Sequence, residues 1–379
     1  MRIVHICISA PYIDDWGYQE NLLPEYLSKH NTDNFVIGCS NVFPDYLSSK
    51  EVETIINKGD KYSIRNVKVV RIPAKKLTTT FVVPYGLKKT LLELQPDVIF
   101  HHGINCTSLI VASRYCKKHG CKLFVDNHAD EYNISSNRLW NFFYHKFLIK
   151  LSLKYVSQIV KRYYGVTHGR CDFMKHYYGI SDDKIGFLPI GADTNASEDL
   201  PDKFTLREKY GYKHSDFIVV SGGKMGIGKG TDLLINTISK INEEKLFVKL
   251  VLFGRFEDTT TESLSSKYEY IHTYGWCNRQ KTLELLKISD LACWPVHHTT
   301  LIEDAVSVGT PIILKKTPTT LHLIDNNGYW IDNNLSSIIQ DYFSCSTTRD
   351  QMRIHAQNKK NELSYNFIAQ KVLDDINQL

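Results

Sequence analysis

The stretch FIVVSGGKMGIGKGTDLLI, residues 217–235, indicates the fold of this chain more directly than any other segment. Residues 217–221 are almost entirely apolar, which is typical of a strand that is buried on both faces. Residues 231–241 then carry apolar side chains at helical spacing. A strand that runs through a glycine-rich turn straight into a helix predicts one step of an α/β fold with parallel strands.

The turn itself has the composition of a phosphate-binding loop. Its glycines allow close backbone approach, and the start of the next helix offers unpaired N–H groups and a positive dipole end. Lys224 and Lys229 add two positive charges. We therefore predict that the loop binds a phosphate or diphosphate; the alternative is a glycine-rich connection with two solvated lysines. The glycines are Gly222, Gly223, Gly226, Gly228 and Gly230.

P-loop NTPases are one class of protein with such a loop. The spacing Gly223-x4-Gly228-Lys229 nearly matches their nucleotide-binding pattern. That pattern needs Ser or Thr directly after the lysine as a ligand for Mg²⁺. Gly230 stands there instead, and Thr231 comes one residue late. The sequence therefore does not favour a P-loop NTPase.

Length and composition exclude several other classes of protein. A chain of 379 residues with 42% apolar and 23% charged residues suggests two ordinary globular domains. The net charge of +5 is too small to indicate a nucleic-acid-binding protein. The nine cysteines are scattered without zinc-site spacing, as expected of reduced thiols and no structural metal. Since neither a targeting segment nor eighteen uninterrupted apolar residues are visible, we expect a cytoplasmic protein, soluble or peripheral at the membrane.

The alternation of strands and helices continues along the chain in two successive α/β halves, with a crossover near residues 189–201. Strands are predicted at 2–9, 35–39, 67–72, 97–102, 122–126, 217–221, 247–253, 291–294 and 311–314. Helices are predicted at 19–30, 87–94, 108–119, 231–241, 280–288 and 303–308.

Histidines stand at the ends of two predicted strands in the first half. His101 and His102 end the strand 97–102, and His128 follows the strand 122–126. Ligands of α/β folds bind at the carboxyl ends of parallel strands, so we expect at least one functional histidine here. His101 and His102 must point to opposite faces of the sheet, so only one of the two can reach the site. A structural role remains the alternative for each single histidine.

Residues 140–164 form a basic segment in which lysines and an arginine recur among apolar residues. One interpretation is one or two amphipathic helices packed on the first sheet. The other is a cationic face that contacts anionic lipid headgroups. The two are compatible if only the lysine-rich side is exposed.

The pattern Gly223-Lys224 with Lys229-Gly230 resembles the G-R-x4-K-G donor loop of the retaining glycosyltransferases of family 4. In that family the two cations hold the diphosphate of a nucleotide sugar. Lys224 replaces the usual arginine, which keeps the charge but loses the bidentate fork. The segment 188–193 (LPIGAD) resembles the family's interdomain signature. Residues 274–276 (YGW) resemble the run that faces the nucleotide base, which implicates Trp276.

The first half is similar to the family as well. Gly17, Tyr18 and Gln19 follow the first strand, where relatives carry a glycine loop beside the donor phosphate and the acceptor. In residues 96–103 (PDVIFHHG), His102 matches the family's catalytic-site histidine. The resemblance also implies that His128 faces the cleft.

The segment 293–313 (CWPVHHTTLIEDAVSVGTPII) departs from the common pattern of two glutamates eight residues apart. The first glutamate is absent, as in a subgroup in which a turn with backbone N–H groups and hydroxyls takes its place. Either Glu303 or Asp304 would then bind the ribose hydroxyls. The turn residues expected at the donor are His298, Thr299, Thr300 and Leu301.

The resemblance implies a GT-B fold, in which two Rossmann-like domains with mainly parallel sheets face an interdomain cleft. The domains would be 1–190 for the acceptor and 191–360 for the donor, with a C-terminal helix in 361–379 that returns to the first domain. It also implies retaining, metal-independent transfer from a UDP- or GDP-sugar to a glycan or lipid-linked oligosaccharide. Bacterial surface-polysaccharide synthesis, such as that of O-antigen or capsule, fits this type of enzyme.

Lys224, Lys229 and the amides of residues 226–231 would stabilise charge on the leaving diphosphate, and His102 would contact the sugar or orient the acceptor hydroxyl. Two alternatives stay open on the sequence. One is a catalytically inactive protein that binds nucleotide sugars, and the other is a GT-B-like nucleotide-sugar epimerase.

Overall fold

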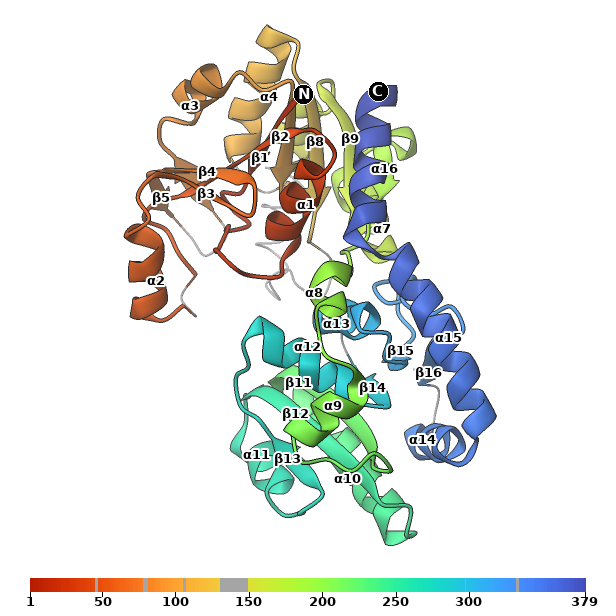
Figure 1. The fold of residues 1–379 in the computed structure, drawn as a ribbon. Coiled ribbons are helices and arrows are strands. Elements are labelled where there is room, and N and C mark those ends of the chain that lie inside the picture. The colour runs from red at the N-terminus through yellow and green to blue at the C-terminus, as the bar shows by residue number, and fades with distance from the viewer. Residues whose placement is uncertain (45–46, 78–80, 105–106, 130–148, 297, 332–333) are drawn as a thin grey trace. The chain divides into compact units, whose positions relative to one another are not determined.

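The computed structural model describes residues 1–379 except 45–46, 78–80, 105–106, 130–148, 297 and 332–333 (Figure 1). The described residues form two compact units. Unit 1 comprises Met1–Pro189 and Ile368–Leu379, and unit 2 comprises Ile190–Phe367. The chain therefore leaves unit 1 after Pro189 and returns to it inside its last helix.

Unit 1 is built on an eight-stranded sheet with the order β10-β9-β8-β7-β1-β2-β4-β3. Its strand pairs are parallel apart from β3, which runs antiparallel to β4. The strands are β1 (Arg2–Ile6), β2 (Asp33–Cys39), β3 (Lys61–Ile64), β4 (Val67–Ile72), β7 (Val98–His102), β8 (Lys122–Asn127), β9 (Val160–Gly165) and β10 (Ile185–Phe187). A separate antiparallel pair consists of β5 (Ala74–Lys76) and β6 (Val82–Pro84).

The helices of unit 1 cover both faces of this sheet. Alternate strand residues such as Ile6, Ile99 and Leu123 pack with apolar residues of α3, α4 and α6. On the opposite face, Tyr164 of β9 donates a hydrogen bond to Asp375 of α16, which runs beside β9 (Figure 1). The helices are α1 (Gln19–Ser28), α2 (Ser49–Ile56), α3 (Leu87–Leu94), α4 (Thr107–His119), α6 (Lys150–Val156), α7 (His168–Phe173), η2 (Met174–Tyr178), η3 (Asp182–Lys184) and α16 (Tyr365–Gln378).

Unit 2 contains a six-stranded parallel sheet with the order β13-β12-β11-β14-β15-β16. Its strands are β11 (Phe217–Met225), β12 (Val248–Phe256), β13 (Ile271–Thr273), β14 (Leu291–Trp294), β15 (Ile312–Lys315) and β16 (Gly328–Ile331). Its helices are α8 (Thr194–Glu198), α9 (Lys203–Lys209), η4 (Ile227–Lys229), α10 (Thr231–Glu243), α11 (Thr259–Ser265), α12 (Arg279–Ile288), α13 (Leu301–Ser307), α14 (Leu335–Ser344) and α15 (Ser346–Glu362).

Most elements lie where the sequence pattern predicts them, and 67–72, 87–94 and 291–294 have the predicted bounds. The prediction of helices throughout 140–164 is wrong in its last part, since Val160–Gly165 is a strand. Valine and tyrosine favour a strand there because they pair with β8 in the core. Residues 140–148 lie outside the described residues. In the part of the chain that the structure describes, no helix is both long and apolar enough to cross a membrane.

The strand β11 is longer than predicted, because the glycines at its end continue the pairing with β12 instead of turning at once. Gly223 and Gly254 stand opposite each other in this ladder, both at positive φ (+101° and +116°). A Cβ on Gly254 would lie 2.1 Å from the Gly223 carbonyl oxygen. The close approach of two backbones therefore holds the first residues of the glycine loop in place.

Replacing Gly254 with alanine is expected to destabilise unit 2 by roughly 3 kcal/mol or more, because it combines a backbone clash with a strained φ. Urea unfolding of the variant measures this loss. The matched control is Gly228→Ala, since a Cβ at Gly228 meets no atom within 4 Å. If both variants unfold at the same urea concentration, the packing at Gly254 does not hold the loop.

Candidate functional site

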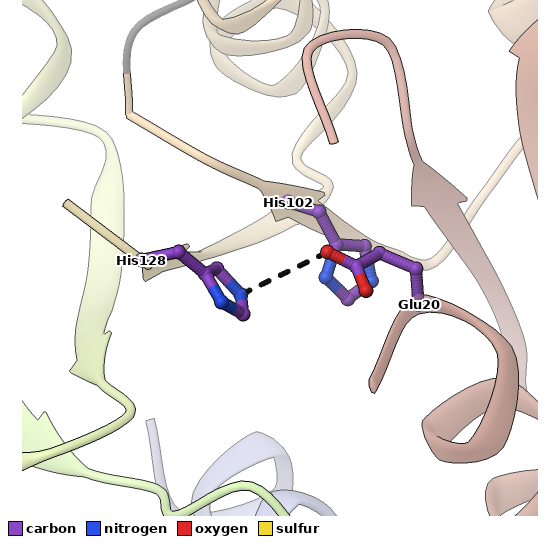
Figure 2. Close-up of side chains that lie close together, drawn as sticks. All are labelled: Glu20, His102 and His128. Carbon is purple, nitrogen blue, oxygen red and sulfur yellow. Dashed lines mark ion pairs between the residues drawn. The ribbon is translucent and has the colours of Figure 1, made fainter. Parts of the chain in front are cut away.

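The carboxylate of Asp126, at the end of β8, is the centre of a polar cluster in unit 1. His102 Nδ1 lies 2.6 Å from Asp126 Oδ2, and the Gly103 amide donates to Oδ1 at 2.8 Å. His128 Nε2 lies 3.4 Å from the same Oδ2 and 3.9 Å from Glu20 Oε1. Figure 2 shows that the His102, His128 and Glu20 side chains converge from three separate segments.

Hydrogen bonds within this cluster determine where the protons lie. An ionised Asp126 accepts the Nδ1 proton of His102, so the Nε2 atom of His102 carries a lone pair. His5 Nδ1 lies 3.1 Å from that atom and can donate to it. Burial, with His102 nearby, lowers the pKa of His5 well below its ordinary value, so this ring stays neutral. Asp126 thereby orients the His102 ring directly and the His5 ring through His102.

The electrostatics favour an ion pair between Asp126 and His128. Burial alone would raise the pKa of Asp126, but His102 and His128 hold it well below its ordinary value. Burial would lower the pKa of His128, but the charge of Asp126 outweighs burial and raises it. His128 also keeps exposed surface, 30% of its side chain, whereas the side chains of His102 and Asp126 are fully buried. His128 is therefore the histidine of this cluster that a ligand can touch directly.

Glu20, His102 and His128 also offer atoms that could ligate a metal ion, all within 4.8 Å of one another. Two imidazoles and a carboxylate are a common set of ligands for transition metals. The Nε2 atom of His102, however, already lies 3.1 Å from His5 Nδ1. The expectation of a metal-independent reaction stays a proposal.

His101 lies on the other face of the sheet, as the alternation of strand residues predicts. Its Nδ1 bonds the Gly103 carbonyl and its Nε2 faces the Ser108 hydroxyl, both at 2.8 Å. Burial lowers the pKa of His101 to about 4. The role of His101 is therefore structural, and the neutral ring links β7 to the start of α4.

The buried His101 makes the stability of unit 1 sensitive to acid. As the pH falls from about 6.5 to 4, the unfolded chain takes up a proton that the folded ring refuses, so the free energy of unfolding falls by about 3 kcal/mol. In His101→Gln, an amide can replace both hydrogen bonds without titrating. Urea unfolding at pH 7 and pH 4 should show that His101→Gln loses less free energy of unfolding in acid than the wild type, by about that amount. The exposed His176→Gln is the control, and equal acid losses in the wild type and His101→Gln would contradict this account.

A buried ion pair holds the loop between β1 and α1. Arg71 Nη2 lies 3.0 Å from Asp14 Oδ1, and the same guanidinium donates to the carbonyl oxygens of Tyr12 and Cys39. Lys58 and Tyr62 also bond Asp14. This network fixes the segment that leads to Gly17, Tyr18 and Gln19.

The residues predicted at this loop lie at the start of α1. Tyr18 is the N-cap residue of the helix, and Gly17 is half-buried just before it. Gln19 is 2% exposed, and neither atom of its amide has a hydrogen-bond partner among the described residues. A buried amide without a partner is costly, so it is a candidate ligand-binding group.

In unit 2 the glycine loop follows the carboxyl end of β11. Lys224 is 62% exposed, with its Nζ 3.8 Å from Glu257 Oε1. Lys229 is half-buried at the end of η4, and no carboxylate of the described residues lies within 4 Å of its Nζ. Asp258 accepts the Ile227 amide and also caps α11. Two lysines therefore stand at one loop, and of the two only Lys224 has a carboxylate of the described residues within 4 Å of its Nζ.

The expectation that the amides of residues 226–231 bind the diphosphate needs correction. Five of these six amides already donate within the loop or to Asp258. The reason is that residues 227–229 form a 3₁₀ turn, which uses its own N–H groups. The lysine charges and the dipole of α10 remain available to an anion. The engaged amides are those of Gly226, Ile227, Lys229, Gly230 and Thr231.

The segment after β14 packs against this loop. A Cβ on Gly230 would lie 2.7 Å from Val296, and one on Gly223 would lie 3.1 Å from Leu301 and 4.0 Å from the Thr299 hydroxyl. Thr300 precedes α13 as its N-cap residue. Two adjoining segments of unit 2, from the end of β11 to α10 and from β14 to α13, therefore hold the predicted residues Gly223, Gly228, Gly230, Thr299, Thr300 and Leu301.

The two adjacent carboxylates of α13 have different surroundings. Asp304 pairs with Arg279 at 2.5 Å, although burial raises its pKa overall. Glu303 Oε1 lies 2.8 Å from His298 Nε2, while Glu303 Oε2 is buried and has no partner among the described residues. Asp304 is thus committed to Arg279, and Glu303 keeps one oxygen for a ligand.

Trp276 is the residue predicted to face the nucleotide base, and it is largely exposed. Its residue exposure is 73%, directly after Gly275 at φ +60°. The Gly275 carbonyl accepts the amide of Gly254, so this turn adjoins the β11–β12 ladder. An exposed indole at such a turn can stack on a flat ring.

The predicted residues therefore form two groups. Unit 1 contains His102, His128, Gly17, Tyr18 and Gln19. Unit 2 contains the two lysines and the glycines of the glycine loop, His298 and the residues of α13. Sequence reasoning missed His5, Asp126, Arg279 and the role of Glu20. A carboxylate at the end of an apolar strand is a sequence signal that could have identified Asp126. A histidine inside the apolar run RIVHICIS is a similar signal for His5.

The glycine loop, its two lysines and the helix behind it lie within a segment that known proteins share. Residues 202–359 match the family described as glycosyl transferases group 1. This group 1 segment covers less than half of the chain and contains the donor-side residues. No curated protein matches the chain in sequence.

Solved glycosyltransferases share the fold over almost the entire chain. A glycosyltransferase from Rickettsia africae has a TM-score of 0.72 at 15% identity, covering 98% of this chain and 97% of its own. Anabaena HepE, solved with UDP-glucose, has a TM-score of 0.69 at 14% identity, with both chains covered fully. WaaG, a glycosyltransferase involved in lipopolysaccharide biosynthesis, has a TM-score of 0.58 at 15% identity, with 99% of each chain covered. The chain therefore has a two-domain, GT-B-like α/β fold with mostly parallel sheets.

Proposed function

We propose that this protein is a retaining glycosyltransferase that moves a sugar from a UDP- or GDP-sugar to a hydroxyl group of a glycan or lipid-linked oligosaccharide. The observation that carries the proposal is the lysine-bearing glycine loop within the group 1 segment, residues 202–359. The nucleotide-sugar complex of the structural neighbour HepE agrees with a nucleotide-sugar donor.

Unit 2 would bind the donor. Lys224, Lys229 and the N-terminal end of α10 lie where they can stabilise charge on the diphosphate. The unpartnered Glu303 Oε2 can accept a ribose hydroxyl, and Trp276 can stack on the base. Because two lysines and a helix terminus supply positive charge, the proposed reaction needs no metal ion.

Unit 1 would serve the sugar and the acceptor. The bond from the anomeric carbon to the β-phosphate oxygen breaks, and the acceptor oxygen forms its bond on the same face of the sugar. The acceptor proton leaves to the departing phosphate. His128, whose pKa the Asp126 carboxylate raises, keeps exposed surface and would orient the sugar or acceptor hydroxyls. The unpartnered amide of Gln19, the residue before Glu20 in the chain, would bind the same ligand. His102 would act as a positioning residue behind Asp126.

A lipid-linked acceptor would require work at a membrane surface. The helix α6 presents Leu151 at 61% and Tyr155 at 42% exposure, with Lys150 and Lys154 on the same short helix. Exposed apolar and cationic side chains together favour contact with anionic headgroups. We propose peripheral binding at the cytoplasmic face of the membrane, in the synthesis of a bacterial surface polysaccharide.

Thermal unfolding with UDP, GDP, CMP and ATP, each with Mg²⁺ or with EDTA, tests the donor. A ligand at 100 times its dissociation constant adds about 2.7 kcal/mol, which moves the midpoint by several degrees. We expect stabilisation by UDP or GDP that persists in EDTA and weakens in Trp276→Ala. Stabilisation by ATP only with Mg²⁺ would contradict the proposal.

Incubation with the UDP- or GDP-sugar and a mixture of glycan acceptors then tests transfer. The expected result is a glycoside with the anomeric configuration of the donor. Donor binding without release of the sugar would instead indicate an inactive binding protein. A changed sugar nucleotide in the absence of acceptor would indicate an epimerase.

A further inference from the structure

A pocket lies in unit 2, at the opposite end of its sheet from the glycine loop. Its volume is about 450 Å³, within the range of small-molecule sites. Phe217 begins β11 and Asp290 directly precedes β14, and both line this pocket. Since β11 spans nine residues at about 3.3 Å each, the pocket is on the order of 25 Å from Lys224.

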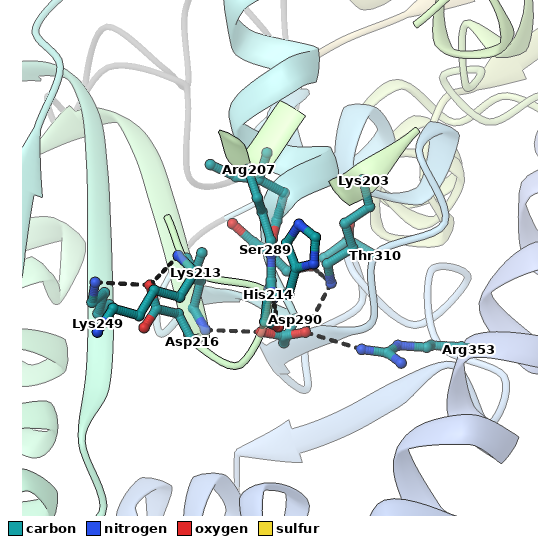
Figure 3. Close-up of polar contacts among 12 residues, drawn as sticks. Lys203, Arg207, Lys213, His214, Asp216, Lys249, Ser289, Asp290, Thr310 and Arg353 are labelled. Carbon is teal, nitrogen blue, oxygen red and sulfur yellow. Dashed lines mark hydrogen bonds and ion pairs between the residues drawn. The ribbon is translucent and has the colours of Figure 1, made fainter. Parts of the chain in front are cut away.

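Positive charge prevails around this pocket (Figure 3). Lys203, Arg207, Arg349 and Arg353 line it, together with the carboxylates of Asp216 and Asp290. Asp216 is already neutralised by Lys249 at 2.8 Å, which lies outside the pocket lining. The four cations then face Asp290, and Arg353 also lies 3.7 Å from the exposed carboxylate of Asp350, so positive charge exceeds negative charge by two.

Asp290 holds these cations together with its full hydrogen-bonding capacity. Its Oδ1 accepts from Lys203 at 2.8 Å and Arg353 at 3.0 Å, and its Oδ2 accepts from Arg207 at 2.7 Å and the Ile218 amide at 2.9 Å. Burial by itself would raise the pKa of Asp290, but Lys203, Arg207 and the Ile218 amide pull it below its ordinary value. The single negative charge of Asp290 therefore holds three positively charged side chains close together.

Three of the cations keep capacity for a ligand. Arg207 is 3% exposed, and its donors go to Asp290 and to two backbone carbonyls, so it is structural. The Lys203 ammonium, which has three protons, donates to the Ser289 carbonyl and to Asp290 and is 25% exposed. Arg353 is 43% exposed, and the half-buried Arg349 donates from Nη1 to the carbonyl oxygens of Tyr342 and Phe343. Burial, with Arg207 and Arg353 beside it, lowers the pKa of Lys203 to about 8 despite Asp290.

An apolar wall completes the pocket. Phe204 is 55% exposed, and its ring centroid lies 4.7 Å from that of His214. Phe217 and Phe343 line the same pocket. An exposed aromatic ring beside clustered guanidinium groups can bind a flat ring and a phosphate at once.

We propose that this pocket is a second ligand site of unit 2 and binds a small organic phosphate, a molecule with a phosphate group and a flat ring. Arg353, Arg349 and Lys203 would bind the phosphate oxygens, and Phe204 would contact the ring. The site is independent of the proposed donor site. A ligand there would join α9 to α15, because Lys203 lies on α9 and Arg353 on α15.

Titration calorimetry of the full chain with phenyl phosphate tests the proposal, because this probe has the ring and the phosphate but no nucleoside. We expect saturable binding that Arg353→Gln and Arg349→Gln each weaken by about tenfold or more. Phe204→Ala should weaken phenyl phosphate but not inorganic phosphate. Circular dichroism checks that each variant is folded. If Arg353→Gln unfolds, Arg353→Lys replaces it, because lysine keeps the ion pair with Asp290, and Arg353→Lys should weaken binding less than tenfold.

Two control variants separate this pocket from other sources of affinity. Lys229→Ala lies in the glycine loop, and Lys213→Gln is an exposed lysine near the pocket but outside its lining. Both should bind phenyl phosphate like the wild type. The proposal is overturned by an absence of saturable binding, by loss of binding in Lys229→Ala with retention in Arg353→Gln, or by equal losses in Lys213→Gln and Arg353→Gln.

Discussion

Replacing Lys229 with alanine is expected to lower the turnover of sugar transfer by about 10²- to 10³-fold without unfolding unit 2. The leaving diphosphate gains negative charge as the bond to the sugar breaks, so a fixed cation contributes most in the transition state. Lys229 is well suited to this role because no carboxylate of the described residues pairs with it. Steady-state kinetics with saturating donor and acceptor measure the effect, and the thermal midpoint monitors folding.

Lys240→Ala is the matched control for Lys229→Ala, since Lys240 is an exposed lysine on the following helix α10. It changes the net charge by the same amount at a distance from the loop and should keep full turnover. If Lys229→Ala is folded and as active as this control, Lys229 does not stabilise the leaving group. An increased KM with unchanged kcat would assign Lys229 to ground-state binding alone.

The fold could be predicted largely because buried parallel strands and amphipathic helices leave strong local patterns. The strand 67–72 and the helix 87–94 are examples whose bounds depend on their own residues. The end of β11 could not be predicted locally. Its last residues stay in the ladder only because Gly254 on another strand lets the backbones approach. Short edge elements such as β13 and β16 likewise depend on a neighbouring strand.

The candidate site was predictable in its residue types but not in its connections. Glycines and lysines in one loop indicate phosphate chemistry without any knowledge of contacts. The choice between Glu303 and Asp304, by contrast, depends on Arg279, which lies 25 positions from Asp304 and commits that carboxylate. Within the Asp126 cluster the accessible histidine is His128 rather than His102, because His5 and Asp126 enclose His102 from two other strands.

Replacing Asp126 with asparagine is expected to lower sugar transfer by about 10²- to 10⁴-fold. The variant keeps the shape of the side chain but removes the charge that raises the pKa of His128. It also presents an N–H group to His102 Nδ1, which shifts the ring proton to Nε2 and places it against His5. NMR titration of the histidines should show a lower pKa for His128, and the rate of transfer should fall in parallel.

Asp375→Asn distinguishes this role from a simple loss of stability. Asp375 is also a buried aspartate of unit 1, but it lies on α16 and bonds Arg162 and Tyr164 instead of a histidine. Both variants remove a buried charge and should lower the thermal midpoint, since each leaves cationic or phenolic partners less well satisfied. Only Asp126→Asn should also change the His128 titration and abolish most transfer in the folded protein. Equal activity losses in the two variants would mean that Asp126 supports the sheet, and that the imidazoles it orients take no part in the reaction.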